Sequence, residues 1–182
     1  MAAIWNLGVD SKAALGFILT LKEGRTRNEL KIEFNRQVTI NASADKVWKI
    51  VGTDFNNISE WASPVLESHA IPDLPPGSGR VCNVKGVGKV VEALYEYDDE
   101  RRTLAFTLES EKNPFFFQKV ENIWRIEPKG DNQSVAHFDV RIKLMPVFAQ
   151  LLSWILKKRL GKRAESFVSE LKYFAENGRA QA

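Results

Sequence analysis

The 182-residue chain has few of the residues from which most catalytic and metal sites are built. Its one cysteine, Cys82, cannot form an internal disulfide, which favours a reducing compartment. The two histidines, His69 and His137, have no partner at metal-ligand spacing, so we expect no metal site. No serine has the surroundings of an acyl-transfer triad, and no glycine pair lies in the strand–loop–helix context of a phosphate loop. The sequence therefore carries no convincing catalytic motif, and we expect no cofactor.

Long apolar runs and a strong excess of one charge are also missing. The apolar stretch at residues 13–21 is too short to cross a bilayer, and no positive charge precedes it as in a secretory signal. The 26 Lys and Arg residues nearly balance 23 Asp and Glu residues, and a net charge of +3 does not argue for nucleic acid. We therefore expect a cytoplasmic protein without a nucleic-acid partner.

The length favours one domain with a core of its own, and the patterning mixes strands with helices. Alternation predicts a first strand over 34–41, after which Ser43 has the character of a helix N-cap. Two short helices are expected at 44–51, where Gly52 ends the first, and at 55–61. Strands follow at 65–71, 80–85, 89–97, 103–110, 115–127 and 133–144. Short turns between them indicate antiparallel pairing, and Pro146 begins a final helix that reaches about residue 176.

Four short passages together resemble the START-like superfamily, also called SRPBCC or Bet v 1-like, and most of all its polyketide cyclase/dehydrase branch. The passages lie at 42–48 (ASADKVW), 61–64 (WASP), 77–80 (GSGR) and 92–102. The resemblance implies an α+β helix-grip fold, in which a seven-stranded antiparallel sheet wraps around the long C-terminal helix. It also implies a hydrophobic cavity between sheet and helix. Residues 1–33 would be an N-terminal extension, and 34–178 the START-like domain.

Glu92 is the sharpest candidate for a functional side chain. In plant hormone receptors of the same superfamily the matching acid faces the cavity, so the resemblance implies that Glu92 would bind the polar group of an apolar ligand. The alternation alone leaves a solvent-facing side open, because Glu92 and Glu96 fall on the same side of the strand. A general-base role is a further alternative.

Aromatic and aliphatic residues of the later strands are expected to form the cavity wall. Trp124 shares a strand side with Asn122, and only one side of the sheet is dry, so Trp124 would point inward. The opposite register, with Lys119 and Glu121 inward, stays open. Of the three phenylalanines at 115–117, at least one must point away from the interior. The expected ligand-binding residues are Trp61, Glu92, Phe106, Phe117, Trp124, Phe138 and Val140.

The last helix carries a basic cluster that begins with Lys157, Lys158 and Arg159 and follows an apolar stretch containing Trp154. Such a helix can contact an anionic membrane surface, although a core helix with a solvated back explains the same pattern.

Three hypotheses result. The leading one is a carrier or sensor of a small hydrophobic molecule, such as a lipid, an aromatic or a polyketide-like compound. The alternatives are a cyclase, aromatase or dehydratase, and a membrane-associated partner protein. The sequence does not predict an oligomeric state.

Overall fold

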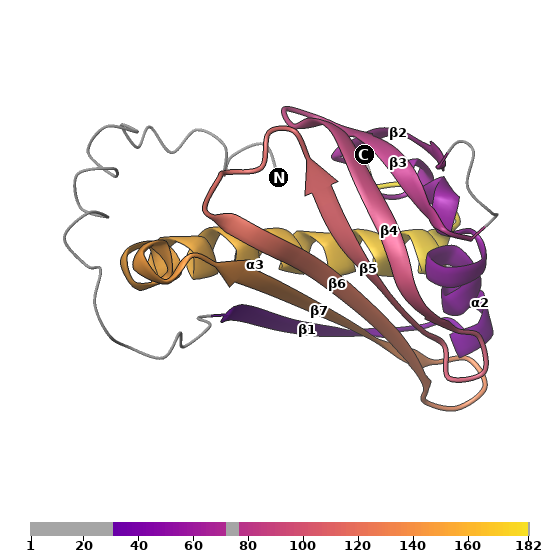
Figure 1. The fold of residues 1–182 in the computed structure, drawn as a ribbon. Helices are drawn as coiled ribbons and strands as arrows, with labels where there is room; N and C mark the ends of the chain where they lie inside the picture. The colour runs from indigo at the N-terminus through magenta and orange to yellow at the C-terminus, as the bar shows by residue number, and fades with distance from the viewer. Residues whose placement is uncertain (1–30, 72–76, 182) are drawn as a thin grey trace.

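One antiparallel sheet and one long helix make up most of the protein (Figure 1). In the computed structural model, the described residues are 31–71 and 77–181. The seven strands are ordered β1-β7-β6-β5-β4-β3-β2, and α3 runs along one face of the sheet (Figure 1). This arrangement confirms the predicted helix-grip fold. The elements are β1 Lys31–Ile40, α2 Ala44–Trp48, η1 Lys49–Thr53, η2 Phe55–Glu60, β2 Val65–Ala70, β3 Gly79–Val84, β4 Gly88–Asp98, β5 Thr103–Ser110, β6 Phe117–Pro128, β7 Ser134–Leu144 and α3 Pro146–Asn177.

Local chemistry explains where the helices begin and end. The Ser43 hydroxyl accepts a hydrogen bond from the Lys46 amide at 3.3 Å, as expected of an N-cap. Pro146 occupies the first turn of α3, where its missing N–H costs little. At the other end of α3, Gly178 adopts the left-handed conformation (φ 69°) and donates its N–H to the Phe174 carbonyl.

The segment between β1 and β2 is confirmed as two short helical pieces, but Gly52 does not end the first one. α2 continues into a π-helical turn, η1, that includes Gly52 and reaches Thr53. A side chain at position 52 would place its Cβ 2.6 Å from the Trp48 indole ring. Glycine is therefore needed here because the Trp48 ring lies directly against the backbone, and not as a helix stop.

Two strand boundaries differ from the sequence prediction by more than one residue. β1 begins at Lys31, before the expected start at residue 34, because Lys31 and Ile32 already pair with β7. β6 begins at Phe117 and not at residue 115, because the Phe117 amide closes a turn by donating to the Pro114 carbonyl. The division into an extension at 1–33 and a domain at 34–178 stays a prediction, and most of that extension falls outside the described residues.

The interior consists of two apolar clusters along α3. The larger cluster joins the inner face of the sheet to the short helices and to the later turns of α3, where Val168 and Leu171 are buried. The smaller cluster lies near the start of α3 and includes Phe34, Phe116 and Phe148. Because both clusters are fixed by packing, the space left between sheet and helix has defined walls.

Candidate functional site

A cavity of about 180 Å³ lies between the inner face of the sheet and α3. Strands β3 to β7 supply most of one wall, and α3 supplies the opposite one. The lining residues are Ile58, Ser63, Pro64, Val65, Arg80, Val84, Val87, Val90, Glu92, Phe106, Leu108, Ser110, Asn113, Phe117, Val120, Asn122, Phe138, Val140, Ile142, Leu160, Arg163, Ala164, Ser166, Phe167 and Glu170. Most of these side chains are apolar, so the few polar ones decide what the cavity can recognise.

A buried ion pair between Arg80 and Glu92 is the main polar feature of the wall. The two residues are directly opposite each other on β3 and β4, and they are 3% and 5% exposed. Arg80 Nε and Nη2 both lie 2.5 Å from Glu92 Oε2. Arg80 Nη1 donates to the Phe55 carbonyl, and the guanidinium lies 3.8 Å from the centre of the Phe55 ring. These contacts hold the pair rigidly at the cavity.

Glu92 therefore lines the cavity, and it is paired there with Arg80. Its contacts with Arg80 use Oε2, and no described residue bonds to Oε1. Oε1 is consequently the acceptor that remains for a ligand. Glu96, on the same side of the strand by simple alternation, is exposed. The reason is an irregularity in the β4–β5 register between Leu94 and Glu96, which shifts the later residues out of the inward row.

The seven residues expected to bind a ligand fall into two groups. Glu92, Phe106, Phe117, Phe138 and Val140 line the cavity. Trp61 and Trp124 do not line it, although both are buried in the larger core cluster. The Trp124 ring stacks on Phe138 with centroids 4.3 Å apart, and Trp61 lies 4.9 Å from Phe167. The two tryptophans therefore pack against the lining residues Phe138 and Phe167, and ligand contact by any of the seven residues stays a prediction.

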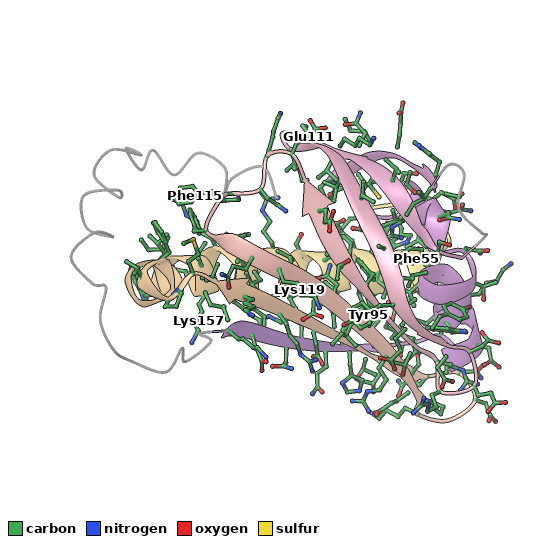
Figure 2. The ribbon with its side chains drawn as sticks, in the orientation of Figure 1. Phe55, Tyr95, Glu111, Phe115, Lys119 and Lys157 are labelled. Carbon is green, nitrogen blue, oxygen red and sulfur yellow. The ribbon has the colours of Figure 1, made fainter. Side chains whose placement is uncertain are left out.

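The β6 register is the one that places Trp124 inward. Trp124, Asn122 and Ile126 are buried. Lys119 and Glu121 lie on the outer face, where they form an ion pair at 2.7 Å and Lys119 stands 5.5 Å from the Tyr95 ring (Figure 2). The alternative register, with a Lys–Glu pair inside, is therefore wrong. The Lys119 contact also lowers the pKa of the Glu121 carboxyl.

The ladder between β5 and β6 is incomplete at one end. Pairing stops at Thr107 and Glu121, although β5 continues to Ser110 and β6 begins at Phe117. A second hollow, of about 570 Å³, lies over this gap. Five lining residues are common to the two hollows: Leu108, Ser110, Asn113, Phe117 and Val120. The inner cavity thus approaches the surface where the two strands separate.

Cys82 lies beside the ion pair but is not a reactive thiol. Its side chain is buried, and burial followed by the negative charge of Glu92 raises the pKa of the thiol from 9.0 to about 12. The thiol is therefore protonated at neutral pH, which is unsuited to nucleophilic chemistry. Cys82 is therefore a small apolar residue of the core.

No metal or membrane-crossing element is found in the part of the chain that the structure describes. Residues 31–71 and 77–181 contain no group of three or more His, Cys, Asp or Glu side chains that could hold an ion. None of the helices within the same ranges is long and apolar enough to span a bilayer.

Sequence reasoning missed Arg80 and did not single out Asn122. A signal for Arg80 was available, because the short turn between β3 and β4 pairs Val84 with Gly88 and so places Arg80 opposite Glu92. Opposite charges at facing positions of one sheet side indicate a pair. The signal for Asn122 was weaker: one amide among Val120, Trp124 and Ile126 on the dry side of β6.

Comparisons with known proteins agree with this geometry. The sequence model of a family described as polyketide cyclase/dehydrase and lipid transport matches residues 31–172. Norcoclaurine synthase from Thalictrum flavum, solved with dopamine and hydroxybenzaldehyde, is similar with 13% identity and a TM-score of 0.59 over 85% of this chain and 94% of that one. The di-domain ARO/CYC protein BexL gives 16% identity and a TM-score of 0.66 over 78% of this chain and 45% of that one.

A third solved structure, Ara h 8.0201, has 14% identity and a TM-score of 0.59, with 80% of this chain and 97% of that one covered. No curated protein sequence matches the chain. At these identities the solved structures show a common fold, whereas the family match covers most of the chain itself. Together they confirm the START-like resemblance expected from the sequence.

Proposed function

Because the chain belongs to the polyketide cyclase/dehydrase and lipid transport family, we propose that it binds a small, largely apolar molecule as a carrier or sensor. The observation that carries this proposal is the cavity between the sheet and α3, with apolar walls and one buried ion pair. A site of this kind binds its ligand through its walls and orients it through its polar groups.

Apolar burial supplies most of the affinity in this proposal. Removing roughly 200 Å² of apolar ligand surface from water contributes about 5 kcal/mol at 25 cal/mol per Å². A hydrogen bond to a charged group adds about 1.5–3 kcal/mol. Glu92 Oε1 therefore sets the orientation of a hydroxyl or amine, and the walls set the affinity.

The cavity volume limits the size of the ligand. A cavity of roughly 150 Å³ is sufficient for benzene. At about 180 Å³, this cavity suits a compound with a single ring or a short isoprenoid, and a longer chain requires that the walls move apart. We therefore favour a small aromatic or isoprenoid compound over a full-length lipid.

Native mass spectrometry of protein isolated from cells tests the proposal. The expected result is a bound small apolar molecule that dissociates when the protein is denatured. In the Glu92→Leu variant the retained compounds should shift toward ones without a hydroxyl or amine. If that variant does not fold, Arg80→Met/Glu92→Leu, which leaves no unpaired buried charge, takes its place. Unchanged selectivity would remove Glu92 from ligand recognition.

A cyclase or dehydratase function is the first alternative, and the buried ion pair favours it because such a pair can hold or move a proton next to an apolar substrate. Incubation with a linear poly-β-ketone thioester is the corresponding assay. Product formation that disappears in Glu92→Gln would assign turnover to this cavity, and binding without any product would leave the carrier function.

Contact with an anionic membrane is the second alternative, and it is favoured by an aromatic and basic end of the molecule. Phe115 and Trp154 are 63% and 72% exposed, and Lys157, Lys158 and Arg159 are exposed nearby on α3. Figure 2 shows Phe115 and Lys157 at the end of the molecule where α3 begins. Exposed aromatic residues beside basic ones suit the headgroup region of a bilayer.

Sedimentation with phosphatidylcholine vesicles, with and without phosphatidylserine, tests this contact. Binding should require phosphatidylserine, weaken as salt increases, and be lost in Lys157→Glu/Lys158→Glu. The matched control is Lys46→Glu/Lys49→Glu, which changes two exposed lysines in α2 and η1, far from the start of α3 (Figure 1). Equal sedimentation of both double variants would exclude docking through α3.

A further inference from the structure

We propose that Asn122 is a second recognition group in the cavity, so that the preferred ligand carries one polar group at each end of an apolar body. This inference rests on the proposed ligand-binding function and extends it from one polar contact to two.

The observation that carries the proposal is a buried amide without a partner. Asn122 is 7% exposed and lines the cavity. Among the described residues its side chain forms no hydrogen bond. Among the described residues, the side-chain atoms that are fully enclosed and have no partner are Asn56 Oδ1, Trp61 Nε1 and Ser134 Oγ. The Asn122 amide is not one of them, so it is not fully enclosed. The Asn122 amide is therefore open to the cavity, where a ligand can reach it.

Leaving such a group unsatisfied is costly. Once a ligand displaces water from the cavity, a donor or acceptor there without a partner costs about 1–3 kcal/mol, whereas an apolar residue at the same position would cost nothing of this kind. The neighbours of Asn122 on the inner side of β6, Val120 and Trp124, are apolar. The presence of an amide between two apolar residues is explained if a ligand forms hydrogen bonds with it.

The strand register places Asn122 apart from the ion pair. Glu92 on β4 pairs with Leu108 of β5, and Asn122 on β6 pairs with Phe106 of β5. The two polar residues are thus two strands apart and displaced by two residues along the strands. With strands about 4.8 Å apart and a rise of about 3.3 Å per residue, their Cα atoms are separated by ~12 Å. Phe106 and Leu108 form an apolar surface between them.

This spacing defines the ligand class. One end of the molecule donates a hydroxyl or amine proton to Glu92 Oε1. The middle packs on Phe106 and Leu108, and the other end exchanges hydrogen bonds with the Asn122 amide, which both donates and accepts. A ligand with only one polar end leaves Asn122 unsatisfied and is disfavoured relative to a ligand with two.

A matched pair of probes tests the proposal by titration calorimetry: 4-propylphenol, with one polar end, and 4-(3-hydroxypropyl)phenol, with two. In Asn122→Leu, which removes the amide at similar volume, the dissociation constant of the two-ended probe should rise about tenfold, equivalent to about 1.4 kcal/mol. The one-ended probe should bind Asn122→Leu at least as tightly as the wild type. Asn122→Ala should show the same preference and is used if the leucine variant does not fold.

The control variant is Asn83→Leu, the same substitution at an exposed position of β3 that does not line the cavity, and it should bind both probes like the wild type. Equal effects of Asn122→Leu on both probes, or no effect on either, would overturn the role of Asn122 while leaving the cavity as a binding site. Failure of both probes to bind the wild type would overturn the proposed function and this inference together.

Discussion

At the scale of single residues, the Arg80–Glu92 pair determines the chemistry of the cavity. Each partner satisfies the other in a place where water is largely excluded, and the Phe55 carbonyl and ring complete the surroundings of the guanidinium. Burying two charges is expensive, so such a pair adds little to stability as a unit, while an unpaired member is strongly unfavourable. The pair is therefore better explained by recognition than by stability.

A double-mutant cycle in urea measures this coupling. Arg80→Met and Glu92→Leu should each lower the free energy of unfolding by about 3–5 kcal/mol, because each leaves a buried charge without its partner. The double variant should be much closer to the wild type than the sum of the two. Additive losses would mean that the two charges do not interact in the folded protein.

Cys82 provides a pH-dependent test of the same region. Burial and the charge of Glu92 raise the pKa of its thiol to about 12, so the folded state holds this proton more tightly than the unfolded state does. The resulting stabilisation is complete below the unfolded pKa near 9.0 and is lost as the pH rises toward about 12. Between about pH 8.5 and about pH 10.5, stability should fall more steeply in the wild type than in Cys82→Ala. Identical slopes would contradict the burial of the thiol.

The sequence predicted the inward position of Glu92 only through a family resemblance, and it did not predict Arg80. Alternation alone placed Glu92 and Glu96 on one side of β4, which fits a solvated face equally well. The irregularity in the β4–β5 register that separates the two acids depends on tertiary pairing, which a local pattern does not encode. The exclusion of Trp61 and Trp124 from the lining has a similar cause: both are buried, but tertiary packing places them against lining rings and not in the lining itself.

At the scale of elements, the pairing of β3 with β4 positions the ion pair, and this pairing depends on Gly79. A Cβ atom at this position would lie 2.1 Å from the Glu92 carbonyl oxygen and 3.0 Å from Ala93 Cα, and the backbone φ is +146°. Glycine is therefore required by both conformation and space, and a larger residue would push β3 away from β4 at the residue next to Arg80.

Gly79→Ala should lower the free energy of unfolding by about 2–5 kcal/mol, the sum of backbone strain and overpacking. Gly77→Ala is the control, since Gly77 also has a positive φ (83°), but no atom lies within 4 Å of the Cβ that alanine would add there. It should lose only about 1–2 kcal/mol. Equal losses in chemical denaturation would show that the close approach of Glu92 is unimportant.

The separated ends of β5 and β6 are the expected entry route for a ligand, and Phe117 stands in that gap. Phe117→Ala should therefore raise the association and dissociation rate constants of 4-propylphenol in stopped-flow measurements. Phe115→Ala removes an exposed ring from the turn before β6, and this ring lines neither hollow, so both rates should be unchanged. Equal rates in both variants would place the entrance elsewhere.

Strand alternation, turn residues and the Pro146 signal were sufficient to predict nearly every element, because they act within a few residues of the chain. The errors at Gly52 and at the start of β6 have local causes that the residue pattern did not reveal. Gly52 was expected to stop a helix but accommodates the Trp48 ring, and β6 starts late because Pro114 and Phe117 form a turn.

At the scale of the whole molecule, the helix-grip arrangement builds the cavity walls from two packed apolar clusters. The smaller apolar cluster, around Phe34 and Phe148, fixes the start of α3 against the sheet. The larger cluster fixes the later turns of α3, and the cavity lies between the sheet and the helix that these clusters hold. Most apolar lining residues belong to these two clusters, so the packing that holds the fold also sets the shape of the cavity.

The most direct test of this account is a methyl-resolved NMR titration of the wild-type protein with 4-propylphenol. Methyl groups that line the cavity, such as those of Val87, Val90 and Val140, should shift with one common dissociation constant. The chemical shifts of the Ile32, Leu144 and Leu156 methyl groups should not change, because these residues belong to the smaller cluster and do not line the cavity. Shifts confined to surface methyl groups, or no saturable shift at any lining residue, would contradict a binding cavity between the sheet and α3.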